Sequence, residues 1–151
     1  MATIRKQILD AIVTALNGAG KPAALTVERF PVSNVEETSL PHVCVRPGRE
    51  NVNLPSDKLR AFPVRERRME VRIECRAQAT GSQAPDEALD PLVAWVTKAT
   101  AEDPTFGKLA IESEEIEIAW EGDEVDARFG MATVTLSVLY TTNAKDQEKA
   151  R

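Results

Sequence analysis

The side chains of this sequence that could do chemistry are few, and their spacing does not favour catalysis. The single histidine, His42, lies two residues before Cys44, and the second cysteine, Cys75, lies far along the chain. These three residue types can bind zinc, but a zinc site needs a fourth ligand that the sequence does not indicate. Two small buried thiols are therefore the favoured interpretation, and no metal site is predicted.

Acidic pairs and glycine motifs lead to the same conclusion. Glu114–Glu115 and Asp123–Glu124 are adjacent residues, so their side chains point in opposite directions on a strand and are solvated in a turn. Neither pair suits general acid–base catalysis. The sequence has no evident Ser/His/Asp set and no phosphate-binding glycine motif. We therefore expect no enzymatic activity and no cofactor.

Charge is the stronger signal, because it is distributed unevenly. The net charge is −5, yet residues 1–80 carry 13 Lys and Arg against 9 Asp and Glu, whereas residues 81–151 carry 6 against 15. Bases concentrate in residues 46–68, and residues 112–126 contain eight acids and no base. This asymmetry favours association with another copy or with a partner of matching pattern. The negative net charge and the absence of interleaved aromatic residues argue against sequence-specific DNA binding, although a basic arm could contact phosphates.

The elements that must position these charges are organised around residues 65–79. Alternate residues there form an apolar row of Met69, Val71, Ile73, Cys75 and Ala77. The residues between them form a charged row of alternating sign, namely Arg68, Glu70, Arg72, Glu74 and Arg76. A period of two predicts a long, half-buried, antiparallel strand whose apolar row needs a covering layer.

Two helices are predicted to supply that layer. The first spans residues 4–16, with Thr3 as N-cap and glycines after its end. The second spans residues 85–101. Pro91 either kinks this second helix or restarts it with Asp90 as cap. Trp95 lies off the apolar stripe and is expected to be partly exposed.

Four further strands are expected at residues 25–30, 42–46, 109–120 and 129–140, with Ile116, Ile118 and Trp120 on one face of the third. Residues 49–64 form a long loop, either an extended arm or a surface loop. The fold class is α+β, in two layers, with a mostly antiparallel sheet of five strands and both helices on one face. Residues 1–142 form one domain, and residues 143–151 a polar, flexible tail.

Several stretches, in this order, resemble the tail terminator proteins of long-tailed bacteriophages. They are IRKQILDAIVTAL, LPHVCVRPG, RRMEVRIECRAQA, DEALDPLVAWVTKATAEDPTFGKLA and ATVTLSVLYTT. Together they span residues 3–142. The Gly107–Lys108 step, where relatives would have Gly-Gly, and Pro91 inside a helix depart from the family pattern.

The resemblance implies a small structural subunit of the virion that assembles as a hexameric ring. Such a ring caps the tail tube at its head-proximal end, stops polymerisation and provides the head–tail joining surface. The implied partners are further copies, the tail tube protein and the head–tail connector or head-closure protein. DNA would pass through the lumen without sequence-specific contact. Assembly would take place in the bacterial host cytoplasm, with no membrane involved.

A ring needs two different, complementary patches on each subunit. The candidate residues for the subunit or tube interface are Arg46, Arg49, Leu54, Leu59, Arg60, Phe62, Arg65, Arg68, Glu70, Arg72, Glu74 and Arg76. The candidates for an acidic lumen or partner face are Glu112, Glu114, Glu117, Glu121, Asp123, Glu124 and Asp126. Alternatives are a head-closure, neck or tail tube subunit, or a small cytosolic enzyme or ligand-binding module with a pocket around His42, Cys44 and Cys75.

Overall fold

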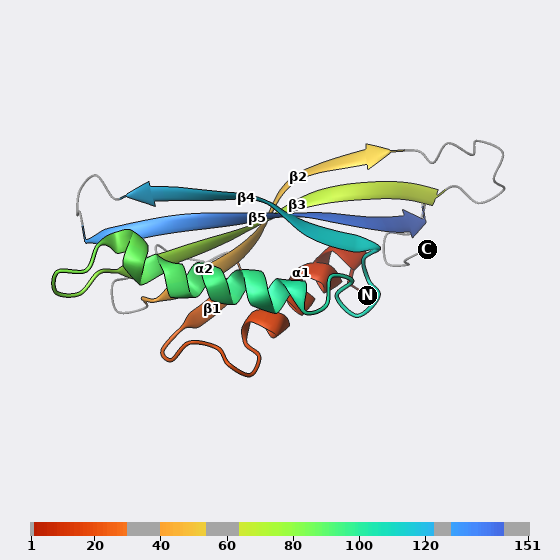
Figure 1. The fold of residues 1–151 in the computed structure, drawn as a ribbon. Coiled ribbons are helices and arrows are strands. Elements are labelled where there is room, and N and C mark those ends of the chain that lie inside the picture. Colours follow the sequence, from red (N-terminus) through yellow and green to blue (C-terminus); the bar gives the residue numbers. More distant parts are fainter. Residues whose placement is uncertain (1, 30–39, 54–63, 123–127, 144–151) are drawn as a thin grey trace.

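The computed structural model describes residues 2–29, 40–53, 64–122 and 128–143. The elements are α1 (Ile4–Leu16), β1 (Thr26–Arg29), β2 (His42–Asn53), β3 (Val64–Gln78), α2 (Pro85–Ala101), β4 (Glu112–Gly122) and β5 (Phe129–Asn143). The sheet order is β1-β2-β3-β5-β4, with β1 parallel to β2 and every other pair antiparallel. Both helices lie on one side of the sheet (Figure 1). The predicted two-layer α+β architecture is confirmed.

The pair β3–β5 forms the centre of the molecule. All fifteen residues of β3 pair with β5 without a register shift. The predicted apolar row of β3 is buried, with Met69, Val71 and Ile73 fully inaccessible. The matching row on β5 faces the same core and runs through Ala132, Val134, Leu136, Val138 and Tyr140. The alternation read from the sequence is thus the alternation between a helix-covered face and an open face.

The helices divide the covered face between them, with α1 on β1 and β2 and α2 mainly on β3 and β5. Thr3 caps α1, because its Oγ1 accepts a hydrogen bond from the Lys6 backbone N–H at 3.2 Å. Gly130 on β5 lets α2 approach closely. A Cβ at this position would lie 2.9 Å from side-chain atoms of Leu89 and Pro85.

For α2, the structure excludes one of the two alternatives at Pro91 and contradicts the prediction for Trp95. The helix continues through Pro91 to Ala101, so it does not restart at Asp90. Trp95 is buried, at 9% exposure, and its Nε1 donates a hydrogen bond to the carbonyl oxygen of Leu16 at 3.0 Å. The prediction of a partly exposed Trp95 was wrong, because the flank beside the apolar stripe of α2 packs against the end of α1.

Several strand boundaries also differ from the prediction. Strand β2 extends to Asn53, and β3 begins at Val64, so the two ends of the predicted loop at residues 49–64 are strand. The remainder of that loop, residues 54–63, lies outside the described residues. Strand β4 begins at Glu112, later than expected. A turn precedes it, in which Asp103 accepts hydrogen bonds from the backbone N–H groups of Thr105 and Gly107.

Candidate interface on the open face of the sheet

The face of the sheet opposite the helices carries the predicted charged residues, and a β-bulge in β4 gathers the acids there. Directly paired residues share a face, and Glu114 pairs with Ser137 on the open side. The register then shifts between Glu115 and Glu117. Because of this shift, Glu117 and Glu121 also point to the open face, where strict alternation would have turned them towards the helices.

The acidic row of β4 therefore comprises Glu112, Glu114, Glu117 and Glu121, all exposed. The same bulge separates the apolar residues of β4. Ile116 lines the open face, whereas Ile118 and Trp120 pair with Val134 and Ala132 on the covered side. The prediction of one row containing Ile116, Ile118 and Trp120 was wrong, because a bulge breaks the period of two.

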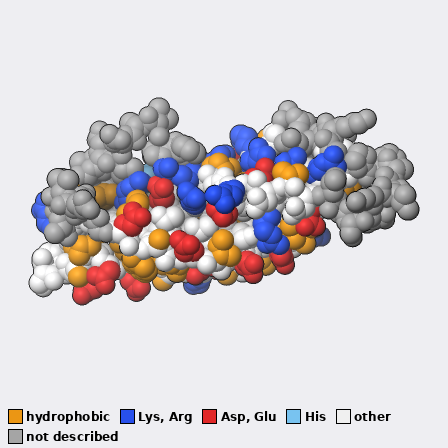
Figure 2. Space-filling view, turned by 90° about the horizontal axis from the view of Figure 1, so that it is seen from above, with side chains coloured by type: hydrophobic (Ala, Val, Ile, Leu, Met, Phe, Trp, Pro, Cys, Tyr) orange, Lys and Arg blue, Asp and Glu red, His pale blue; other side chains and the backbone are white. Residues whose placement is uncertain are grey.

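Bases gather on the open face of β2 and β3, where the arginine row comprises Arg46, Arg49, Arg68, Arg72 and Arg76. Viewed onto this face, Lys and Arg side chains form a band along the middle, and Asp and Glu side chains recur below it (Figure 2). Arg65 belongs elsewhere, because it pairs with Thr142 on the covered face. Leu54, Leu59, Arg60 and Phe62, like Asp123, Glu124 and Asp126, lie outside the described residues.

Much of the arginine row is paired within the chain. Glu74 Oε2 lies 3.1 Å from Arg46 Nη2 and 3.0 Å from Arg76 Nη2. Arg72 is less restrained, because its Nη2 lies 3.8 Å from Glu70 Oε2 and its side chain is 52% exposed. Arg49 is exposed and makes no hydrogen bond or ion pair with the described residues.

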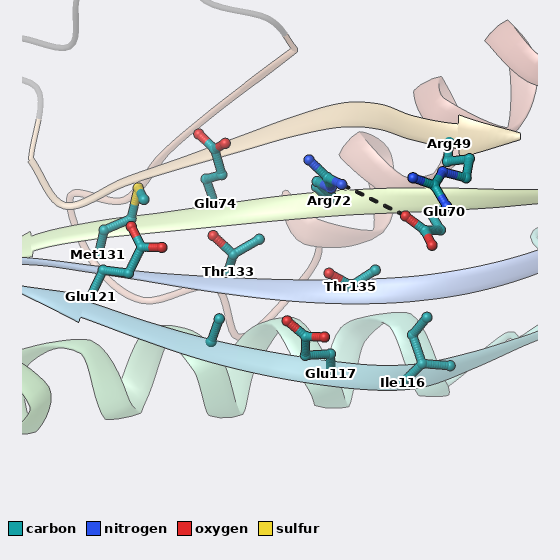
Figure 3. Close-up of a pocket in the computed structure, with 11 residues that line it drawn as sticks. Arg49, Glu70, Arg72, Glu74, Ile116, Glu117, Glu121, Met131, Thr133 and Thr135 are labelled. Atoms are coloured by element: carbon teal, nitrogen blue, oxygen red, sulfur yellow. Dashed lines mark ion pairs between the residues drawn. The ribbon is translucent and has the colours of Figure 1, made fainter.

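A shallow groove of about 450 Å³ separates the arginine row from the acidic row. Arg49 and Arg72 stand on one side of it and Glu117 and Glu121 on the other (Figure 3). The floor is β5, which presents short side chains such as Thr133. The β4 wall of the groove is acidic, whereas the wall formed by β2 and β3 carries Arg49 and Arg72 together with Glu70 and Glu74. Such a surface suits a charged macromolecular partner better than a small apolar ligand.

The cysteines and the histidine do not converge. Cys44 and Cys75 are both buried free thiols, as expected. Cys44 pairs with Glu74 on the open face, whereas Cys75 faces the helices, where burial raises its thiol pKa to about 12. His42 Nε2 lies 3.3 Å from Glu28 Oε2. Within the described ranges, no three His, Cys, Asp or Glu side chains are grouped to hold a metal ion.

Sequence reasoning missed a polar cluster on the covered face, centred on Glu50. The register of β2 shifts between Pro47 and Glu50, which turns Glu50 towards α1. Its Oε2 lies 2.6 Å from Arg5 Nη2 and 3.4 Å from Arg67 Nη1, and its Oε1 accepts a hydrogen bond from the Tyr140 hydroxyl. Arg67, 8% exposed, also donates from Nε to Thr142 Oγ1 at 3.0 Å.

Electrostatics within the Glu50 cluster favour the ionised carboxylate. Burial alone would raise the pKa of Glu50, but hydrogen bonds from Arg5 and Tyr140, together with the charges of Arg5 and Arg67, lower it below its ordinary value. Burial and the neighbouring Glu50 raise the pKa of Tyr140, so its hydroxyl stays a donor. The dipeptide Pro47–Gly48 inside a strand was the one sequence signal for the bulge that creates this cluster.

The comparisons with known proteins show a likeness in fold but no match in sequence family. No family model and no curated protein matches the chain. The fold is similar to that of a chain in a structure described as the virion of a native gene transfer agent (GTA) particle. The two chains are 15% identical, with 93% of this chain and 92% of the other covered and a TM-score of 0.42. In the described part of the chain, no helix is long and apolar enough to cross a membrane.

Proposed function

We propose that the protein is a non-enzymatic structural subunit of a bacteriophage virion, which forms a hexameric ring at the head-proximal end of the tail. The ring caps the tail tube, ends its polymerisation and offers the surface to which the head is joined. The family resemblance across residues 3–142 motivates this proposal. The observation that carries it is the open sheet face, where β4 carries only acids and β2 and β3 carry arginines interspersed with Glu70 and Glu74.

A closed ring repeats one heterologous contact, so each subunit must present two different patches on opposite flanks. The sheet order places β4, with the acidic row, at one edge, and the arginine row lies over β2 and β3 towards the other edge. The two rows therefore lie at different sides of the subunit. This arrangement meets the requirement for repetition around an axis, and opposite charges would select the correct neighbour.

The other partners in this proposal are the tail tube protein and the head–tail connector or head-closure protein. DNA would cross the lumen without sequence-specific contact. The net charge of −5 suits such a passage, since a like-charged ring does not retain DNA.

The test is the mass and location of the assembled protein. Light scattering and negative-stain microscopy of the purified protein, alone and with tail tubes, should give rings of six 16.6 kDa chains. Monomers alone, even with tubes present, would contradict the proposal. Antibody labelling of particles should mark only the head-proximal end of the tail. Label along the whole tube would indicate a tube subunit, and label restricted to the neck above the tail would indicate a head-closure protein.

A further inference from the structure

We infer that, in the ring, the β4 edge of one copy lies on the arginine row of the next, so that Glu117 and Glu121 pair with Arg49 and Arg72 of the neighbouring copy. This inference rests on the proposed ring and names the surfaces that make its contact. The occupant of the arginine row is thus a second copy of this chain. Four observations on the described residues lead to this assignment.

Strand β4 is a free edge that displays both acids and apolar side chains. It is the last strand in the sheet order and pairs only with β5 among the described elements. Large hydrophobic side chains exposed on or beside it are Ile111 at 53%, Ile116 at 50% and Trp120 at 47%. Exposed apolar residues beside charges are typical of a protein contact. The glutamates would also prevent unspecific edge-to-edge pairing of this strand.

The arginine row contains two arginines that are weakly paired or unpaired among the described residues. Arg46 and Arg76 are held by Glu74, whereas Arg49 has no described partner and Arg72 has only the distant Glu70. Arginine pairs well with a carboxylate because its guanidinium offers parallel donors. Two exposed guanidinium groups beside one groove therefore suit two carboxylates from outside the subunit.

Gly48 of β2 lies close to the Arg72 side chain. A Cβ on Gly48 would lie 3.2 Å from Arg72 Nε and 3.2 Å from Glu70 Cβ. The absence of a side chain therefore leaves room for Arg72 to lie beside β2. The arginine is presented next to Arg49 at the groove, where both line the same wall.

Arg72 and Glu117 do not contact each other within the described subunit. Both are paired with Thr135 of β5, so two strand spacings, roughly 10 Å, separate their backbones. The internal connection across β5 is made elsewhere, where Arg68 Nη2 reaches Glu112 Oε1 at 3.5 Å. At the groove, the acids and bases of one subunit face each other without contact. In the ring, the acids of each copy pair with the arginines of the next copy, so both rows gain a partner.

The experiment exchanges the charges on each surface separately. The base variant carries Arg49→Glu and Arg72→Glu, and the acid variant carries Glu117→Lys and Glu121→Lys. All four positions are exposed, so circular dichroism should show both variants folded. Each variant alone should lose the hexamer mass in light scattering, because every contact would bring like charges together. A second variant, Arg49→Gln with Arg72→Gln, removes the positive charges without reversing them. The protein concentration needed for ring assembly should then rise about tenfold.

Mixing the two variants provides the decisive readout. In an alternating ring, each contact joins either two native surfaces or two reversed surfaces, so every contact is again attractive. Native mass spectrometry of a 1:1 mixture should therefore show hexamers with three copies of each variant. Failure of the mixture to assemble, while both variants remain folded, would overturn the inference.

Matched controls place the same charge changes on the helix side of the molecule. Lys98→Glu with Lys108→Glu, and Glu87→Lys with Glu102→Lys, alter exposed positions away from the open face and should leave the ring intact. If the base and acid variants also form rings at wild-type concentration, the inference is wrong and the proposed function stands. If the wild-type protein forms no ring even with tail tubes, the proposed function itself fails.

Discussion

The two faces of the sheet use the same residue types for opposite purposes. On the covered face, Arg5, Arg67 and Tyr140 converge on one carboxylate, Glu50. On the open face, Arg72 and Glu70 stand at 3.8 Å in solvent, and Arg49 has no described partner. Buried charges must be satisfied within the fold, whereas exposed pairs contribute little to stability. The comparison indicates that the Glu50 cluster stabilises the subunit, whereas the arginine row on the open face is available for association.

Substitution of Glu50 should give the largest loss of stability. Glu50→Ala leaves the buried Arg67 and the partly buried Arg5 without their carboxylate, which should lower the free energy of unfolding by roughly 3 kcal/mol. Urea denaturation measures this loss. The matched control is Glu70→Ala on the open face, which should change the free energy of unfolding by less than about 0.5 kcal/mol. Equal losses for both variants would remove the distinction between the two faces.

Removal of one hydroxyl should have an intermediate effect. Tyr140→Phe keeps the ring in the core but removes the donor to Glu50, so we expect a loss of about 1–2 kcal/mol in the free energy of unfolding. Thermal and urea denaturation should agree on this value. A variant as stable as the wild type would show that water or the arginines replace the tyrosine hydroxyl at Glu50.

The pH dependence of stability should report on the same cluster. Because the folded-state pKa of Glu50 is lowered from 4.5, its contribution is present above that value and is lost as the pH falls through the lower folded-state pKa. Glu50→Gln should therefore lose less stability than the wild type between pH 5 and strongly acidic conditions. Urea denaturation at each pH measures the free energy of unfolding of both proteins. If the two free energies fall in parallel as the pH is lowered, this assignment is contradicted.

The smallest effect on stability is expected on the open face. Arg72→Ala should change the free energy of unfolding by less than about 0.5 kcal/mol, because its side chain is 52% exposed and only loosely paired. The same variant should nevertheless weaken ring assembly in light scattering. A clear loss of stability without any effect on assembly would place Arg72 among the residues that maintain the fold.

Regular patterns in the sequence predicted most of the fold. The alternation at residues 69–77 located β3 and its buried row, and the helical spacing located α1 and α2. The predictions failed where tertiary contacts or bulges decide the outcome. Trp95 is buried by a neighbouring helix, which no local pattern encodes. The extension of β2 past Pro47 and Gly48 depends on pairing with β3, which compensates for a sequence typical of a turn.

The candidate site was predicted in part, for a related reason. The sequence identified the bases of β2 and β3 and the acids of β4, but it placed Arg65 with them and missed the role of Glu50. A bulge changes which face a residue occupies, and its position follows from pairing across strands, so it is not visible along one strand. The ring, its partners and the single-domain boundary at residue 142 stay predictions.

The uninterrupted pairing of β3 with β5 has a mechanical consequence. Fifteen paired residues at about 3.3 Å each form a regular, rigid two-stranded unit roughly 50 Å long, the central pair. Both register shifts lie in the strands that flank the central pair, β2 and β4. These two flanking strands can therefore gain, lose or shift a residue while the central pair keeps its shape. Insertions selected in such a chain should accumulate in the strands beside the central pair and be rare within β3 and β5.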